Sequence, residues 1–471
     1  MGLKFKLDNK FKEKKFDSSS LNQLLESPMD GIELEELLEK FEREVMPYCS
    51  NFTSELFMGF PDAGNSLAGL IGALLSDFLQ QNLINASFCA PIATYLEIAV
   101  VKWLRELIGY KIDPINSIWD VGGIITYGGT GSNATAMLLA RENFKKDTMK
   151  NGVNNAADFK IVIPKGIGHY SIKSSSMWIG CGDNIIEVPT KNYRYDLACL
   201  EETLIKYKGK IMCVVAYIGD SRTMSIENLQ KVYELVRRID KNIWLHADAC
   251  HGFSLAFSEK LKSKITGIEL FDSISTDPHK VLNIPYCASA LLIKNPCKFN
   301  LIASTSDLIM KEDFAWGQIT PFIGSKSWNS LKIWFLLKNL GIKRIGEIIE
   351  KRCDIAMALA HKIKSRDDFI LINDVDINSV VFMYRGEGLE LDVNRLNFLN
   401  KEIHHLMLNE GKYHLHSFAL NDDNGVYEKN VVLTPLRYMS GNPTIQEIHL
   451  DELLNYIVKL GKEVIHNNEY M

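Results

Sequence analysis

The chain has 471 residues, of which 46% are hydrophobic and 24% are charged, and its formal net charge is −5. This length suits two or three domains, the composition is that of a soluble globular protein, and the acidic balance argues against a nucleic-acid surface. The apolar run at 67–79 is too short to span a membrane, and the nine cysteines form no C-x-x-C pair, which predicts reduced thiols in the cytoplasm.

Residues 1–110 are predicted to form a helical segment. Apolar residues recur at helical spacing over 31–41, and two further helices are expected between 66 and 109. A segment of this kind clasps a partner subunit or covers the core of its own chain, and periodicity does not separate the two.

Residues 111–340 alternate between short β-rich runs and helical patterns, which predicts a large α/β domain with a mostly parallel sheet. Ligands of such sheets bind beyond the carboxyl ends of the strands, so a site is expected in the loops that follow them. Residues 341–471 mix both patterns and predict a smaller α+β domain. Expected strands lie at 123–127, 160–163, 184–188, 211–216, 243–246, 379–384 and 431–434, and expected helices at 133–144, 172–177, 197–206, 226–239, 329–350, 394–408 and 448–460.

The first candidate loop is the glycine-rich turn at 127–133, between an expected strand and an expected helix. Glycines allow positive φ angles, and the free N–H groups of the helix start can bind a phosphate. Thr130, Ser132 and Asn133 can add side-chain donors. The turn also fits a dinucleotide fingerprint, but the next expected strand runs into Pro164 rather than an acidic residue, which leaves a nicotinamide cofactor as an alternative.

The second candidate is His246-Ala247-Asp248, directly after a buried run. A buried aspartate at the end of a strand needs a charged or hydrogen-bonded partner, and the ring nitrogen of a pyridine cofactor is one such partner. A metal held by His246, Asp248 and His251 is the alternative. It is disfavoured because His251 lies beyond a turn and no further ligands cluster nearby.

The third candidate is Lys280, in the stretch Asp277-Pro278-His279-Lys280, between apolar runs at 268–271 and 288–293 that predict two buried strands. Burial disfavours the charged form of a lysine, and the neutral amine is a nucleophile suited to a Schiff base with a carbonyl cofactor, above all pyridoxal 5′-phosphate (PLP). Taken alone, the same stretch also fits a surface lysine in a loop.

Two further side chains complete the set. His169 follows the expected strand at 160–163 and could stack on a flat heteroaromatic ring. Arg437 follows the expected strand at 431–434 and could hold a substrate carboxylate through two hydrogen bonds.

Taken together, these motifs resemble, in type and order, those of the group II PLP-dependent amino-acid decarboxylases, the glutamate, cysteine-sulfinate and aromatic-L-amino-acid decarboxylase family. The resemblance covers roughly residues 52 to 461. The segments that carry it are 90–97, 128–133, 169–173, 244–249, Asp277-Pro278-His279-Lys280, 330–335, Arg437 and Asn442-Pro443.

The resemblance implies a PLP-dependent transferase fold of type I, like that of aspartate aminotransferase, with a seven-stranded, mostly parallel sheet. It implies a carboxy-lyase of amino-acid metabolism that is a homodimer with active sites at the subunit interface, in which residues 1–110 would clasp the second copy of the chain. Lys280 would form the internal aldimine, His169 would stack on the pyridine ring and Asp248 would pair with its nitrogen. The family pattern places further cofactor contacts at Gly131, Ser132, Ser221, Asp277 and His279, and substrate contacts at Phe60 and Arg437. No metal is expected.

Three departures from the family pattern bear on the chemistry. Asp220 stands where the family usually has threonine, which would place a carboxylate near the phosphate if it pointed inward. The turn at 324–327 lacks the family's arginines. The loop between Ser304 and Thr320 contains no tyrosine, and Phe314 is the residue that best matches the family's proton-donating tyrosine.

In family members that lack this tyrosine, the carbanion can instead react with oxygen, which gives an aldehyde, ammonia and peroxide. We predict that the protein decarboxylates an L-α-amino acid to the amine and CO2. A decarboxylating oxidase, a catalytically impaired relative and a nicotinamide-dependent oxidoreductase remain alternatives. The substrate stays open because the segment at Phe60-Pro61 resembles the aromatic type, whereas that at His169-Tyr170 leans toward the glutamate type.

Overall fold

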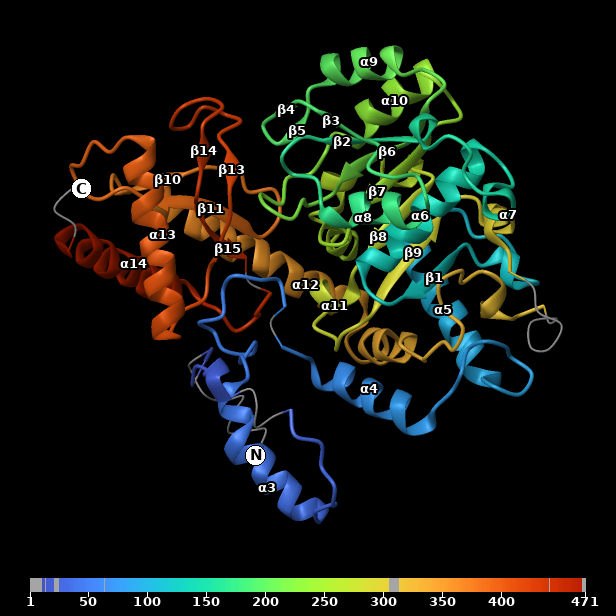
Figure 1. The fold of residues 1–471 in the computed structure, drawn as a ribbon, viewed down its shortest axis with the longest axis horizontal. Helices are drawn as coiled ribbons and strands as arrows, with labels where there is room; N and C mark the ends of the chain where they lie inside the picture. Colours follow the sequence, from blue (N-terminus) through green and yellow to red (C-terminus); the bar gives the residue numbers. More distant parts are fainter. Residues whose placement is uncertain are drawn as a thin grey trace.

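The structure is a computed structural model that describes residues 11–467, except residues 13, 21–24, 63, 305–312 and 440. Two lobes stand side by side, with an N-terminal helical segment below them (Figure 1). Within the described residues, no helix combines the length and the apolar character that a membrane crossing needs.

A seven-stranded sheet forms the centre of the large lobe and confirms the predicted α/β fold of type I. The strand order is β1-β9-β8-β7-β6-β2-β3, in which β9 runs antiparallel to β1 and β8 and the remaining neighbours are parallel. The strands are β1 (Gly123–Thr126), β2 (Lys160–Pro164), β3 (Ile185–Val188), β6 (Ile211–Tyr217), β7 (Trp244–Asp248), β8 (Ser273–Thr276) and β9 (Ser289–Ile293).

The central strands are buried on both faces because helices cover the sheet. Helix α6 packs against five of the strands and against α8, which places its N-terminus beside the ends of β7 and β8. The helices of this lobe are α5 (Pro91–Leu107), α6 (Gly129–Phe144), α7 (Thr148–Asn151), α8 (Tyr170–Trp178), α9 (Leu197–Lys206), α10 (Leu229–Ile239) and α11 (Pro278–Val281). The hairpin of β4 (Thr190–Lys191) and β5 (Arg194–Tyr195) lies between β3 and α9 in the chain.

The small lobe contains a four-stranded antiparallel sheet in the order β10-β11-β15-β12 and a separate hairpin of β13 and β14. Helices α13 and α14 pack on each other and on β11. The elements are β10 (Phe369–Leu371), β11 (Ser379–Tyr384), α13 (Val393–Glu410), β12 (His416–Ser417), β13 (Leu420–Asn421), β14 (Val432–Leu433), β15 (Leu436–Met439) and α14 (Glu447–Asn467).

The long helix α12 (Ser330–Lys364) joins the two lobes. Its N-terminal part belongs to the hydrophobic core of the large lobe, up to Cys353, and its C-terminal part to the core of the small lobe, from Ala356. Gly341 interrupts it with φ 70°, a conformation that glycine adopts freely. This kink lies at the predicted boundary between residues 340 and 341, and the three-part division of the chain stays a prediction.

Two of the expected strands differ in the structure. The run at 268–271 forms a short 3₁₀ turn, and the strand that precedes Lys280 is β8, Ser-Ile-Ser-Thr. Its hydroxyl-bearing residues carry little apolar signal, but they are fully buried because β8 lies between β7 and β9. In the small lobe, the run at 431–434 contributes only the two residues of β14, and Arg437 lies on β15.

Candidate active site

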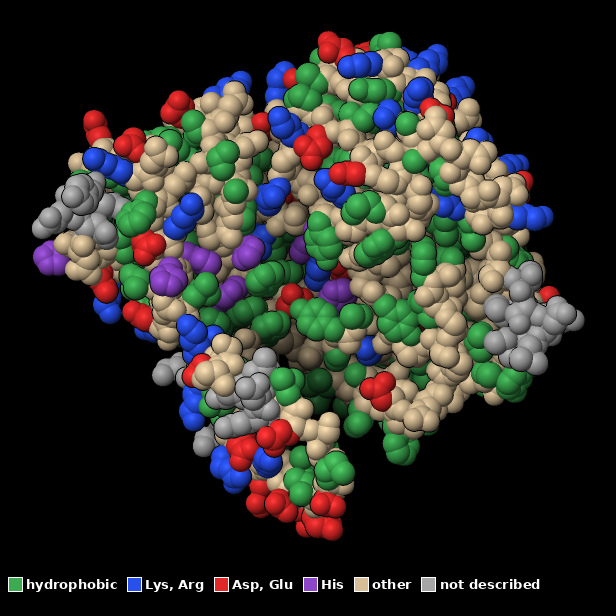
Figure 2. Space-filling model, viewed as in Figure 1, with side chains coloured by type: hydrophobic (Ala, Val, Ile, Leu, Met, Phe, Trp, Pro, Cys, Tyr) green, Lys and Arg blue, Asp and Glu red, His purple; other side chains and the backbone are tan. Residues whose placement is uncertain are grey.

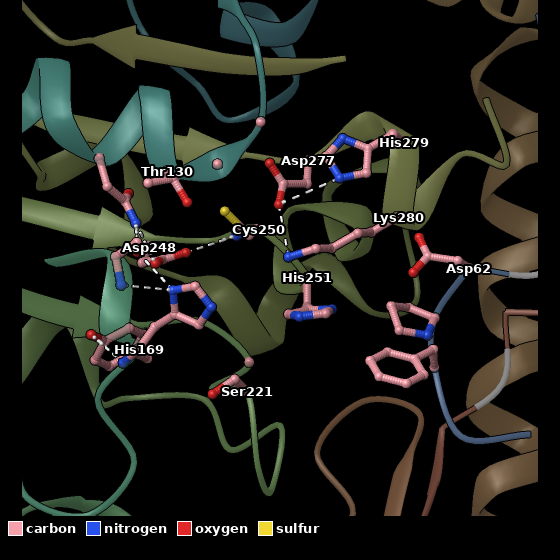
Figure 3. Close-up of a pocket in the computed structure, with 18 of the residues that line it drawn as sticks. Asp62, Thr130, His169, Ser221, Asp248, Cys250, His251, Asp277, His279 and Lys280 are labelled. Atoms are coloured by element: carbon pink, nitrogen blue, oxygen red, sulfur yellow. Dashed lines mark hydrogen bonds and ion pairs between the residues drawn. The ribbon is translucent and has the colours of Figure 1, made fainter. Parts of the chain in front are cut away.

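A cavity of about 370 Å³ lies at the carboxyl edge of the large sheet, where the small lobe approaches it. Figure 3 shows its side chains converging from β7, α11, the N-terminal ends of α6 and α8, and the loops beside them. The structure brings eight of the predicted site residues into its wall: Phe60, His169, Ser221, Asp248, Asp277, His279, Lys280 and Arg437.

Lys280 lies in the one-turn helix α11, which begins at Pro278. Proline favours the first position of a helix, and a helical turn brings residues three apart onto one face. Lys280 Nζ therefore lies 2.8 Å from Asp277 Oδ2. Asp277 is 1% exposed, and its other oxygen accepts a hydrogen bond from Ser289.

This ion pair reverses the expected effect of burial on the lysine. Burial lowers the pKa of Lys280, as the sequence suggested, but the charge of Asp277 outweighs it and the net pKa is raised. For Asp277, burial raises the pKa, whereas Lys280 and His279 lower it, to about 2. In the free enzyme, the amine is thus held as a cation beside its carboxylate.

Asp248 ends β7 and points into the cavity (Figure 3). Its Oδ2 accepts a hydrogen bond of 2.9 Å from Asn133 Nδ2, and its Oδ1 accepts one of 3.2 Å from the Cys250 backbone. Asn133 comes from α6, whose packing across β7 brings it there. The amide nitrogen of Asn133 must face the carboxylate, so its oxygen faces the other way.

That orientation fixes a directed chain of buried hydrogen bonds. Asn133 Oδ1 accepts from His246 Nε2 at 3.0 Å, so His246 Nδ1 is left to accept from Ser273 Oγ at 2.8 Å, and Ser273 Oγ accepts from Trp244 Nε1 at 2.7 Å. His246 is therefore a buried structural histidine. No group of three or more metal-ligand side chains is present in the described part of the chain.

The same amide also sets the ring of His169. Asn133 Nδ2 donates to Ser171 Oγ at 2.8 Å, and Ser171 Oγ then donates to His169 Nδ1 at 2.7 Å. His169 is the N-cap of α8, where its Nδ1 also accepts from the Ser171 backbone. Burial lowers the pKa of His169, which favours a neutral ring with its proton on Nε2. No sequence pattern predicts this dual role of Asn133, and the glycine turn predicts a phosphate donor at this position instead.

The buried His246 predicts a loss of stability in acid. Burial lowers its folded-state pKa from 6.5 to about 4, so its contribution is complete above pH 6.5 and is lost as the pH falls toward 4. Over that window this residue should account for about 3 kcal/mol of the free energy of unfolding. Urea denaturation at pH 7 and pH 4.5 measures it. His246→Gln should flatten the pH dependence, whereas His405→Gln, at an exposed position on α13, should leave it as in the native chain.

The glycine turn reaches the cavity with Gly128, Gly129, Thr130 and Asn133. Gly128 adopts φ 88°, and a Cβ on Gly129 would lie 2.8 Å from both Asp277 Oδ2 and Cys250 Sγ, so glycine is required there. The two contacts predicted in this turn, Gly131 and Ser132, do not line the cavity. The Ser132 hydroxyl lies 2.6 Å from Thr126 Oγ1 and is fully buried, and Thr130 takes the position facing the cavity.

Asp220 points away from the cavity, into its own loop. Its carboxylate accepts hydrogen bonds from the backbones of Arg222, Thr223 and Ser225 and from the Thr223 hydroxyl. Burial raises its pKa, and these bonds oppose that effect. Asp220 therefore shapes the loop that presents Ser221, and the expected conflict with a phosphate does not arise.

Arg437 reaches the cavity from β15 and joins the lobes. Its guanidinium donates to the backbone carbonyls of Ser221 and Gly59 and lies over the ring of Phe60, 5.9 Å from its centroid. Arg437 Nε is buried and has no partner among the described residues, so it can still donate to a ligand. Phe60 in turn stacks on His414, at 5.7 Å. Figure 2 shows histidine side chains gathered in a band between the two lobes.

Several cavity residues were not singled out from the sequence: Asp62, Tyr217, Cys250 and Tyr286. His251, weighed as a metal ligand, also lines the cavity. A signal was available for Tyr217 and Cys250, which end or follow buried strands as Asp248 does. Asp62 and Tyr286 lie in loops whose course depends on tertiary packing. Residues 305–312, in the loop that lacks the family's tyrosine, lie outside the described residues. Phe314 is described, packs against Tyr95 at 5.4 Å and is not part of the cavity wall.

Comparison with known proteins shows one family. The model of the pyridoxal-dependent decarboxylase conserved domain matches residues 20–385. L-2,4-diaminobutyrate decarboxylase of Acinetobacter baumannii is 27% identical over 334 residues, which are 65% of this chain and 63% of that protein. Aromatic-L-amino-acid decarboxylase of Bacillus atrophaeus is 24% identical over 94% of this chain and 89% of its own length.

The fold has counterparts among solved structures. The crystal structure of mouse CSAD in apo form superposes with a TM-score of 0.85 at 23% identity, over 98% of this chain and 95% of that one. At this identity the likeness describes the fold alone.

Proposed function

The chain belongs to the pyridoxal-dependent decarboxylase family, and on that premise we propose that it removes the α-carboxylate of an L-amino acid as CO2 and releases the amine. Family membership makes it a PLP-dependent carboxy-lyase. The observation that carries the proposal is the convergence of Lys280, Asp248 and His169 on one cavity.

The residues present fit PLP. A buried carboxylate, Asp248, is aimed into a cavity of suitable size, and a flat ring, His169, lies in the wall beside it. Asp248 would hold the pyridine nitrogen, His169 the face of the ring, and Lys280 the aldehyde carbon. The N-terminal turn of α6 with Thr130, together with Ser221 and His279, would hold the phosphate.

When bound, PLP supplies an electron sink for the charge left at Cα as CO2 departs. The protein residues prepare that step. Asp248 favours a proton on the cofactor nitrogen, and Asn133 holds the carboxylate in place. Arg437 Nε is available to orient the substrate carboxylate. Lys280 and Asp277 keep a proton at Nζ, on the cavity side, where it can be moved to or from the substrate.

We favour an amine over an aldehyde as the product. The aldehyde-forming alternative depends on Phe314 in place of a tyrosine that reaches in from the partner subunit, whereas the relatives compared above are named as decarboxylases. The test is a screen of L-amino acids with the PLP-loaded enzyme, measuring CO2, amine, oxygen uptake and peroxide together. CO2 and amine in equal amounts support the proposal, whereas oxygen consumption equal to the CO2 released contradicts it.

We further propose a cytoplasmic homodimer with an interface active site. The described nine cysteines are all free, which supports a reducing compartment. Helices α3 (Leu34–Glu44) and α4 (Leu67–Leu79) lie at the bottom of Figure 1, and α4 packs on α12 through one of its faces. α3 buries none of its residues, and α4 exposes a row of large apolar side chains, namely Leu67, Ile71, Leu74 and Phe78. An apolar surface of this kind indicates a covering partner.

Charging that surface should separate the subunits. The double variant Leu74→Glu/Phe78→Glu is expected to run as a monomer in analytical ultracentrifugation and to lose decarboxylation activity. Lys401→Glu, an exposed change on α13, is the control and should remain dimeric. A double variant that stays dimeric would contradict the assignment of α4 to the interface.

A further inference from the structure

Three carboxylates and two cations line the cavity, and their pairing is unequal. The carboxylates are Asp62, Asp248 and Asp277, and the cations are Lys280 and Arg437. Asp277 is matched by Lys280 at 2.8 Å and by Ser289. Asp248 accepts from Asn133 and from the Cys250 backbone, and the proposed function assigns it to the cofactor nitrogen. Asp277 and Asp248 therefore already have partners or an assigned role within the site.

Asp62 is the acid that retains an open position. Its Oδ1 is buried and has no hydrogen-bond partner among the described residues. The Tyr286 hydroxyl bonds to the carboxylate, and the charges of His279 and Lys280 also act on it. A buried carboxylate oxygen without a donor is costly, so this position is suited to a ligand that brings one. Because Lys280 already pairs with Asp277, it does not fill this role.

The position of Asp62 matches the substrate side of the cavity. In Figure 3, Asp248 and His169 lie to one side of the Lys280 amine and Asp62 to the other. Asp62 follows Phe60-Pro61 in the cavity wall, and Gly59, at the start of this segment, accepts a hydrogen bond from Arg437. The segment at 59–62 thus contacts the cation Arg437 at Gly59 and carries the carboxylate of Asp62 at its other end.

A substrate with a carboxylate for Arg437 and a separate ammonium for Asp62 would pair with both residues. Its α-carboxylate suits Arg437, its α-amine is consumed at the Lys280 end, and a second, side-chain ammonium suits Asp62. An aromatic or acidic side chain would leave the Asp62 oxygen unpaired or would bring a like charge next to it.

We propose that Asp62 determines substrate specificity by binding a side-chain ammonium, so that the enzyme acts on L-diamino acids. This inference deepens the proposed function and rests on it. One charge-assisted hydrogen bond to a buried carboxylate corresponds to a preference of about 10- to 100-fold.

The test compares substrates that differ only in the terminal charge. The PLP-loaded enzyme is assayed for CO2 release from L-2,4-diaminobutyrate, L-ornithine and L-lysine, each against the uncharged amino acid of matching length, and from L-phenylalanine and L-glutamate. We expect kcat/KM for the best diamino acid to exceed that of its uncharged match by at least about 10-fold. Asp62→Asn should remove this preference mainly through KM, and Asp62→Glu should restore part of it. Glu202→Gln, an exposed acid on α9, should leave it as in the native enzyme.

A preference for an aromatic or acidic substrate, or a diamino-acid preference that survives Asp62→Asn, overturns the inference and leaves the decarboxylase assignment intact. If no amino acid releases CO2, the proposed function fails. The specificity of Asp62 for an ammonium is then tested separately, by measuring the binding of amines. Calorimetry with putrescine and butylamine should then show at least about 10-fold tighter binding of the diamine, lost in Asp62→Asn. Equal affinities would overturn it. Retention of PLP absorbance by each variant confirms that the site is folded.

Discussion

Replacing Lys280 with alanine is expected to abolish decarboxylation, by roughly 10⁴-fold or more, because the nucleophile and a proton-transfer group are removed together. The variant should also lose covalently bound PLP, seen as the absence of borohydride-fixed cofactor in the intact mass. Lys294→Ala, an exposed change just after β9, should retain both properties.

A second variant separates the loss of amine chemistry from a loss of folding. Lys280→Ala leaves Asp277 buried without its cation, which should lower the free energy of unfolding by a few kcal/mol. Lys280→Arg keeps the charge next to Asp277 and should fold with nearly native stability, yet it should be equally inactive. Activity in Lys280→Arg would mean that charge rather than amine chemistry is what this position supplies.

Replacing Asp248 with asparagine is expected to lower kcat by about 10²- to 10³-fold while PLP still binds. An amide has no charge with which to favour a proton on the cofactor nitrogen, so the cofactor becomes a weaker electron acceptor. The change is nearly isosteric, so the lobes and the cavity should be retained. Steady-state kinetics and the PLP content after gel filtration measure the two quantities.

The control for this variant is Asp183→Asn, which alters an exposed carboxylate paired with Lys173. It should leave kcat unchanged. If Asp248→Asn also keeps its full kcat, Asp248 is not the residue that acts on the cofactor nitrogen, and the proposed arrangement of the ring in the cavity is wrong.

The fold was largely predictable because the large lobe repeats a strong pattern. The runs at 160–163, 211–216 and 243–246 are continuous β-branched or apolar stretches, as buried parallel strands require, and each becomes a strand of the sheet. The strand before Lys280 was missed because Ser273–Thr276 is buried by its neighbours and not by its own apolarity. Similarly, β15, which carries Arg437, has only four residues and follows β14 after two.

The site was predictable where a residue's position follows from its own strand or turn. Asp248 and Lys280 are of this kind. The pairing of Asp277 with Lys280 could have been foreseen, since Pro278 starts a helical turn that brings residues 277 and 280 together. Asn133 and Asp62 were not foreseeable in their observed roles, because each depends on a contact between segments more than 100 residues apart in the sequence, to Asp248 and to Tyr286 respectively.

The directed chain of hydrogen bonds from Trp244 to Asn133 connects the active site to residues that do not line the cavity. Trp244, Ser273 and His246 are absent from the cavity wall, yet the donor that each passes to the next matches the orientation that Asp248 imposes on the Asn133 amide and so reinforces it. A substitution at Ser273 therefore acts on the cofactor partner from a distance, through the order of donors and acceptors. Engineering libraries restricted to the residues around the ligand would leave out the position that sets this order.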